Sequence, residues 1–147
     1  MKTALLLVLI AVLVYAYDPV FVNELRDLVK DKGDKKLLKV LRHNAYMIRS
    51  TKEAKVNEIL KKQDEATQKL YAETVQAKKL KRKAKIDKRI SKAGEKDQAV
   101  KDYLEQAEKI INDMTISDDD ARKKLKELKA KLNKKQRKLL IKLKKFT

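Results

Sequence analysis

Hydrophobic residues recur at three- and four-residue spacing along most of the chain. The pattern is clearest after Gly94, where the apolar positions are Val100, Tyr103, Leu104, Ala107, Ile110, Ile111 and Met114. This period is typical of a helix that packs on one face. No segment alternates convincingly at period two, so strands are not expected. The sequence therefore predicts an all-α fold, a single bundle of five to six helices with short loops.

Helix start and stop signals divide the first fifty residues. Asp18 followed by Pro19 predicts a helix over about 19–32, which Gly33 can end in the left-handed conformation. Asp34 can cap a second helix. The apolar stripe expected on that second helix is Leu37, Leu41, Ala45 and Ile48.

The middle of the chain has no glycine or proline between Ser50 and Gly94. Ser50 and Glu53 have the spacing of a capping box, which marks a helix start. The composition predicts one long helix over about 51–93, or two helices joined by a soft kink. Its heptad positions are too polar for a strong coiled coil.

Two further caps divide the C-terminal third. Ser117 with Asp120 predicts a helix start, and Asn133 with Gln136 predicts a last, short helix. The apolar residues assigned to these two helices are Ala121, Leu125, Leu128 and Leu132, then Leu139, Leu140, Leu143 and Phe146.

The N-terminus has the layout of a secretory signal peptide. Lys2 precedes an apolar run, and Val14 and Ala16 stand at the positions of a small-residue cleavage site. We therefore expect residues 1–16 to be removed and residues 17–147 to form a single helical domain of a secreted, extracellular protein. The chain has no cysteine, so disulfides cannot stabilise that domain and helix packing must.

A formal net charge of +18 raises the question of an anionic partner. The densest basic run comprises Lys78, Lys79, Lys81, Arg82, Lys83, Lys85, Lys88, Arg89 and Lys92. It can be a solvated helix face, or it can bind a polyanion such as an acidic polysaccharide or an anionic membrane. Nucleic acid is not expected, because the chain is predicted to be secreted and lacks interleaved aromatic residues. A second basic block, residues 134–145, carries an apolar face. Cationic helices with one apolar face also occur in membrane-surface peptides, and the polyanion reading includes this block, but we assign its apolar face to the core.

Catalysis is not expected from this composition. One histidine, no cysteine and no glycine-rich loop leave little for nucleophilic or phosphate-cradling chemistry. We predict that the protein is not an enzyme.

The acidic residues Asp113, Asp118, Asp119 and Asp120 stand out in so basic a chain. Started at Asp113, the spacing of an EF-hand calcium loop fails, because Asp118 replaces its glycine and Lys124 its last glutamate. Helix initiation accounts for Asp118, Asp119 and Asp120, since carboxylates in a first turn gain about 0.3–1 kcal/mol each from the helix dipole. A looser oxygen site for Mg²⁺ or Ca²⁺, formed by the four carboxylates and loop carbonyls, remains a second reading.

Residues 99–143 resemble the C-terminal part of the nematode SXP/RAL family of secreted antigens, which includes an Anisakis-allergen-like cation-binding domain. The resemblance rests on Ile110-Ile111-Asn112-Asp113, on Thr115-Ile116-Ser117 and on Leu125-Lys126-Glu127-Leu128. It implies a secreted, non-enzymatic helical protein that binds Mg²⁺ or Ca²⁺. The basic run at 78–92 departs from the family pattern.

A small-lipid carrier, similar to the secreted fatty-acid- and retinol-binding helical proteins of nematodes, is the third reading. Such a carrier needs a hollow bundle. The apolar stripes here are narrow, so we expect a filled core and place this reading last. A cavity of several hundred Å³ would reverse that order.

Overall fold

The computed structural model describes residues 18–144, and this range is helical except for short connections. Its helices are α2 (Val22–Leu28), α3 (Lys32–His43), α4 (Arg49–Leu60), α5 (Glu65–Gly94), α6 (Gln98–Asn112), α7 (Asp118–Ala130) and α8 (Lys134–Lys144). The all-α prediction is confirmed, although these helices outnumber the five to six expected. Within the described range, β-type pairing is limited to an isolated bridge between Ile48 and Ser117. The predicted signal peptide, residues 1–16, and Phe146 lie outside the described residues.

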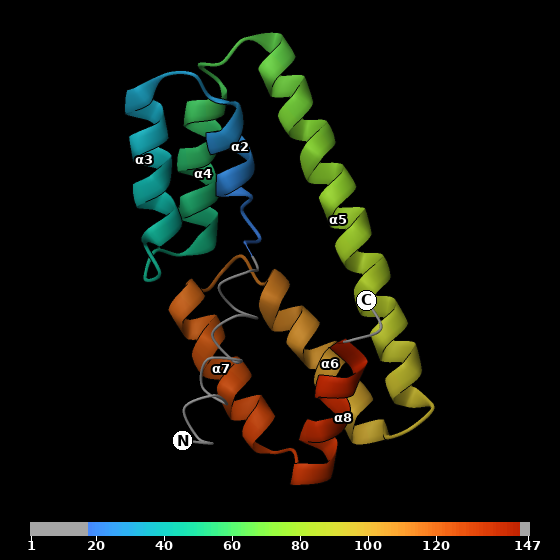
Figure 1. Ribbon diagram of the computed structural model, residues 1–147. Helices are drawn as coiled ribbons and strands as arrows, with labels where there is room; N and C mark the ends of the chain where they lie inside the picture. The colour runs from blue at the N-terminus through green and yellow to red at the C-terminus, as the bar shows by residue number, and fades with distance from the viewer. Residues whose placement is uncertain (1–17, 145–147) are drawn as a thin grey trace, which may run out of the picture.

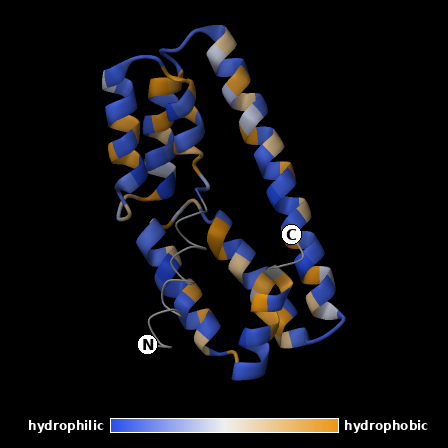
Figure 2. Ribbon diagram, in the orientation of Figure 1, coloured by the Kyte–Doolittle hydropathy of each residue, from blue (hydrophilic) through white to orange (hydrophobic). Residues whose placement is uncertain are grey.

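The helices form two groups that share α5 (Figure 1). Helices α2, α3 and α4 pack together, α6, α7 and α8 form the second group, and α5 runs past both. Each group has its own hydrophobic cluster, centred on Leu25, Leu38 and Val56 in the first and on Val100 and Leu143 in the second. In Figure 2 hydrophobic residues gather within these groups, while much of α5 is hydrophilic. None of the described helices has both the length and the hydropathy of a membrane span.

The predicted long helix over about 51–93 is wrong as a single element. The chain turns at residues 61–64, which separates α4 from α5. The Asp64 carboxylate accepts a hydrogen bond from the backbone N–H of Thr67 at 2.7 Å. Aspartate favours this N-cap position over a helix interior, where its side chain competes for backbone donors. The cap thus starts a new helix, so the break is a turn and not a soft kink.

The predicted start of the preceding helix is also wrong. Ser50 does not cap α4, which begins at Arg49 after Ile48 and has no side-chain cap. Two of its first N–H groups bond to another part of the chain instead: Arg49 donates to the carbonyl of Ile116 (3.1 Å) and Ser50 to that of Met114 (2.9 Å). Because tertiary contacts satisfy these donors, the capping box is not needed.

The boundaries near the N-terminus differ from prediction in a similar way. The Asp18 carboxylate caps a turn, accepting from the N–H groups of Val20 and Val22, and α2 begins only at Val22. Asp31, and not Asp34, caps α3, so Gly33 lies inside that helix instead of ending its predecessor. In the described chain the left-handed conformation belongs to Phe21, with φ 57°.

The buried residues of α3 also differ from the predicted stripe. Leu38 and Leu41 reach the core, whereas Leu37 is 53% exposed, and Ala45 and Ile48 follow the helix. The predicted stripe of α3 is therefore wrong except for Leu41.

The two C-terminal caps are confirmed. The Ser117 hydroxyl accepts from the N–H of Asp120 at 3.0 Å, and α7 follows. Asn133 and Gln136 bond reciprocally, each side chain accepting from the other's backbone N–H at 2.9 and 3.0 Å. Local capping chemistry thus decides where α7 and α8 begin.

Candidate functional site

The four aspartates of the acidic segment have separate partners. Asp113 accepts from the backbone and hydroxyl of Thr115, and Asp119 pairs with Lys123 at 2.8 Å. Asp120 bonds with Ser117. Asp118 alone faces the molecule's interior, where its carboxylate meets two cations.

Those cations are Arg49 and Lys52, and both are almost completely buried. Arg49 Nε lies 2.8 Å from one oxygen of Asp118, and Lys52 Nζ lies 2.7 Å from the other. Burial acts to raise the pKa of the Asp118 carboxyl, but the hydrogen bonds from Lys52 and Arg49 outweigh it and hold that pKa below its usual value. We call Arg49, Lys52 and Asp118 the clasp.

The Arg49 guanidinium also reaches the C-terminal end of α6. Its Nη1 donates to the carbonyl oxygens of Ile110, Ile111 and Asp113 at 3.1, 3.0 and 3.0 Å. A carboxylate and several carbonyls are the oxygen set that a hard cation prefers. Here the chain's own guanidinium lies among these oxygens and satisfies the last carbonyls of the helix.

Backbone hydrogen bonds also join the start of α4 to the segment between α6 and α7. Besides the two bonds from the start of α4, the N–H of Asp119 donates to the carbonyl of Ala45 at 2.9 Å. The α3–α4 connection and the α6–α7 connection therefore lie side by side. The clasp and these bonds join the two helix groups.

The residues between 18 and 144 contain no group of three or more His, Cys, Asp or Glu side chains suited to a metal ion. The divalent-cation site at Asp113, Asp118, Asp119 and Asp120 stays a prediction, and the placement of those carboxylates offers it no support.

The basic run of α5 is divided between internal contacts and solvent. Lys78 pairs with Glu24 at 2.7 Å, and Arg82 lies over the Phe21 ring, 4.5 Å from its centroid, while donating to the carbonyl of Asp18. Lys81 and Lys88 are exposed. The run is thus partly structural, because several of its cations fasten α5 to the segment before α2 and to α2 itself.

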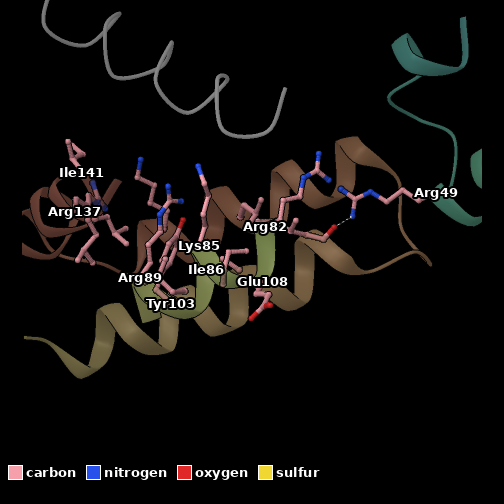
Figure 3. Close-up of a pocket in the computed structure, with 16 residues that line it drawn as sticks. Arg49, Arg82, Lys85, Ile86, Arg89, Tyr103, Glu108, Arg137 and Ile141 are labelled. Carbon is pink, nitrogen blue, oxygen red and sulfur yellow. Dashed lines mark hydrogen bonds between the residues drawn. The ribbon is translucent and has the colours of Figure 1, made fainter. Parts of the chain in front are cut away.

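Lys85 and Arg89, from the same run, line a cavity of about 250 Å³ between α5, α6, α7 and α8. Its walls are mostly apolar and include Ile86, Leu104, Ala107, Leu125, Leu140 and Leu143. Figure 3 shows the lining side chains in a row, with Arg49 of the clasp at one end and Arg137 at the other. These helices therefore leave a cavity beside their hydrophobic cluster, which the narrow stripes did not predict.

The cavity carries cations as well as apolar walls. Lys85, Arg89, Lys129 and Arg137 line it and are all partly buried. Burial lowers the pKa of Arg89. Burial, followed by the nearby charge of Arg137, lowers the pKa of Lys129. Each shift reflects a positive charge that is poorly solvated where it lies.

Tyr103 adds a hydroxyl to this lining. Burial raises the pKa of Tyr103, so its O–H group stays protonated at neutral pH and can donate a hydrogen bond. Apolar walls with several donors suit a ligand that has a hydrocarbon part and an anionic part.

A second hollow of about 330 Å³ adjoins the first and shares Arg82, Ile86 and Glu108 with it. Phe21 and Met114 also line it. The space between α5 and α6 therefore extends from the second helix group toward the first.

Sequence reasoning named Lys85 and Arg89 as anion-binding candidates and placed Arg137 in the second basic block, but it missed Lys129 and Tyr103. No local signal distinguishes Lys129 from the lysines beside it. Only the position of α7 and α8 against α5 brings these cations together.

Comparison with protein-family models, with curated proteins and with solved structures found no match to this chain. The resemblance to the SXP/RAL family stays a prediction.

Proposed function

We propose that the protein is a non-enzymatic binding protein that holds an anionic, single-chain lipid in the cavity between α5, α6, α7 and α8. The observation that carries this proposal is the pairing of apolar walls with partly buried cations around about 250 Å³. Together with the adjoining hollow of about 330 Å³, this cavity reaches several hundred Å³, so the lipid-carrier reading becomes the first.

The size of the cavity favours a slender ligand. Small-molecule sites commonly enclose about 300–1,000 Å³, and about 250 Å³ lies just below that range. One hydrocarbon chain fits such a space better than a two-chain lipid. Each buried methylene contributes about 0.8 kcal/mol, and the cations supply a partner for an acidic head group.

Titration with a fluorescent fatty acid tests the proposal. We expect saturable binding in the micromolar range, about −8 kcal/mol, with one site per chain. Ala107→Leu should weaken it, because Ala107 is buried against the cavity and a larger side chain fills the space. Ala99→Leu, at an exposed position of the same helix, is the matched control. Absence of saturable binding to the unaltered protein would overturn the proposal.

A second candidate function is polyanion binding along α5. Lys81, Lys85, Lys88 and Lys92 follow one another at four- and three-residue spacing, so they form one stripe on the helix. Elution from heparin resin well above physiological salt, lost when Lys81 and Lys88 are changed to glutamine, is the expected result. Elution at or below physiological salt would exclude it.

We further propose that the protein is secreted and belongs to the SXP/RAL type of antigen. Support comes from the signal-peptide pattern at residues 1–16 and from the motifs between 99 and 143. A mature protein whose N-terminal residue is Tyr17 is the expected product of secretion. Calorimetry with Ca²⁺ and Mg²⁺ tests the cation site at Asp113, Asp118, Asp119 and Asp120.

A further inference from the structure

Cations from three helices line the cavity. Lys85 and Arg89 come from α5, Lys129 from α7 and Arg137 from α8. Glu108 supplies the acidic side chain of the lining, and it also lines the second hollow beside Arg82. The lining is therefore strongly positive.

Two of these cations have no counter-ion in the described chain. Within residues 18–144 neither Lys129 nor Arg137 forms an ion pair. Arg137 donates through Nη2 to the carbonyl of Ala130 at 2.9 Å, but its buried Nε has no hydrogen-bond partner there. Since buried donors are normally satisfied, this nitrogen is a group that a ligand head would meet. The partly buried Lys129 ammonium lines the same cavity.

The positive charge of the lining exceeds what one carboxylate can neutralise. Lys129 and Arg137, which form no ion pair within residues 18–144, line the cavity together with the Tyr103 hydroxyl. A carboxylate has one negative charge and two oxygens. A phosphate monoester carries about −1.5 to −2 at pH 7 and offers three acceptor oxygens, and guanidinium groups bind phosphate through paired hydrogen bonds.

We infer that the cavity selects a single-chain lipid with a phosphate monoester head group over a fatty acid of the same chain length. This inference rests on the proposed function, because it names the ligand class of the same cavity. The hydrocarbon chain lies along Leu104 and Ala107, and the phosphate lies among Lys129, Arg137 and Tyr103.

Displacement of a bound fluorescent fatty acid by decyl phosphate and by decanoate tests the inference. Both competitors have the same chain length and are used below their micelle concentrations. At pH 7.5 we expect decyl phosphate to bind at least tenfold more tightly. The advantage should shrink at pH 5.5, because the second phosphate pKa is about 6, whereas a carboxylate stays ionised over this range.

Variants locate the head group. Lys129→Gln and Arg137→Gln should each weaken the binding of decyl phosphate more than the binding of decanoate. Lys126→Gln, on the same helix as Lys129 but exposed and outside the lining, should change neither. Far-UV circular dichroism and a thermal unfolding curve for each variant verify that the fold is kept.

The possible outcomes separate the two proposals. Equal affinities for the two competitors at both pH values would overturn the phosphate inference and leave the lipid-binding function intact. Displacement by inorganic phosphate alone at similar concentrations would overturn the lipid part of the inference. Failure of the fluorescent fatty acid and of both competitors to bind would overturn the function itself.

Discussion

The clasp holds two buried cations and the cavity is lined by partly buried ones, but the clasp also contains a carboxylate that pairs with its cations. In the clasp, Arg49 and Lys52 share both oxygens of Asp118. In the cavity, Lys129 and Arg137 have no ion-pair partner within residues 18–144.

This difference indicates different roles. A buried cation with its counter-ion and its full set of hydrogen bonds holds structure together, since removing its partner leaves a charge that water cannot reach. A partly buried cation that lacks a counter-ion is poorly solvated, and it lowers stability unless something else supplies the negative charge. Within residues 18–144 the clasp cations have their counter-charge, whereas Lys129 and Arg137 gain one only when an anion binds in the cavity.

The largest expected effect is the loss of stability when the Asp118 carboxylate, which both clasp cations share, is removed. Asp118→Asn should lower the free energy of unfolding by about 3–5 kcal/mol, because Arg49 and Lys52 remain buried without a counter-charge. Urea denaturation at pH 7 measures the loss. Asp119→Asn is the neighbouring control: its partner Lys123 is exposed, so its effect should be small. Equal losses in the two variants would contradict a structural role for the clasp.

Acid should weaken the clasp and leave the cavity cations charged. The folded-state pKa of Asp118 is lowered, so its contribution is fully present above the ordinary aspartate value of about 3.9. It is lost as the pH falls below that value and through the depressed pKa. We expect the unaltered protein to lose more unfolding free energy between pH 6 and pH 3 than Asp118→Asn does. Parallel losses would show that other carboxylates carry the acid sensitivity.

The contrast between these regions also explains what the sequence could predict. Helix caps lie within four residues of the groups that they satisfy, so Ser117 and Asn133 marked the starts of α7 and α8 correctly. Asp64 with Thr67 is the same kind of signal. The uninterrupted run of helix-forming residues around it favours one helix, so composition alone masks this cap.

Long-range pairs leave no such local signal. Arg49 meets Asp118 across 69 positions and Lys52 meets it across 66, so the clasp follows from packing and not from spacing. The cavity is still harder to predict from the sequence. Apolar stripes show which face a helix buries, but not how far apart four helices lie when they bury it.

A bound anion should supply negative charge to the cavity cations and so stabilise the folded protein. Decyl phosphate at a free concentration 100 times its Kd should raise the free energy of unfolding by about 2.7 kcal/mol. Ala107→Leu should lose most of that gain, because the added side chain occupies the cavity. Thermal unfolding with and without the compound measures both. An equal rise in the two proteins would place the compound elsewhere on the molecule.

The smallest expected effect is that of removing a cavity cation, and it tests directly whether the cavity cations and the clasp cations have different roles. Lys129→Gln should leave the unfolding free energy of the ligand-free protein within about 0.5 kcal/mol of its original value, in contrast to Asp118→Asn. The reason is that burial and Arg137 lower the folded-state pKa of Lys129, so its charge costs stability below that pKa. This cost is relieved as the pH rises through the lowered pKa, and the unaltered protein should gain slightly there, whereas Lys129→Gln should not. Urea denaturation at pH 7 and pH 10 measures the difference. A loss as large as that of Asp118→Asn would make Lys129 a second structural cation and remove the distinction between the two regions.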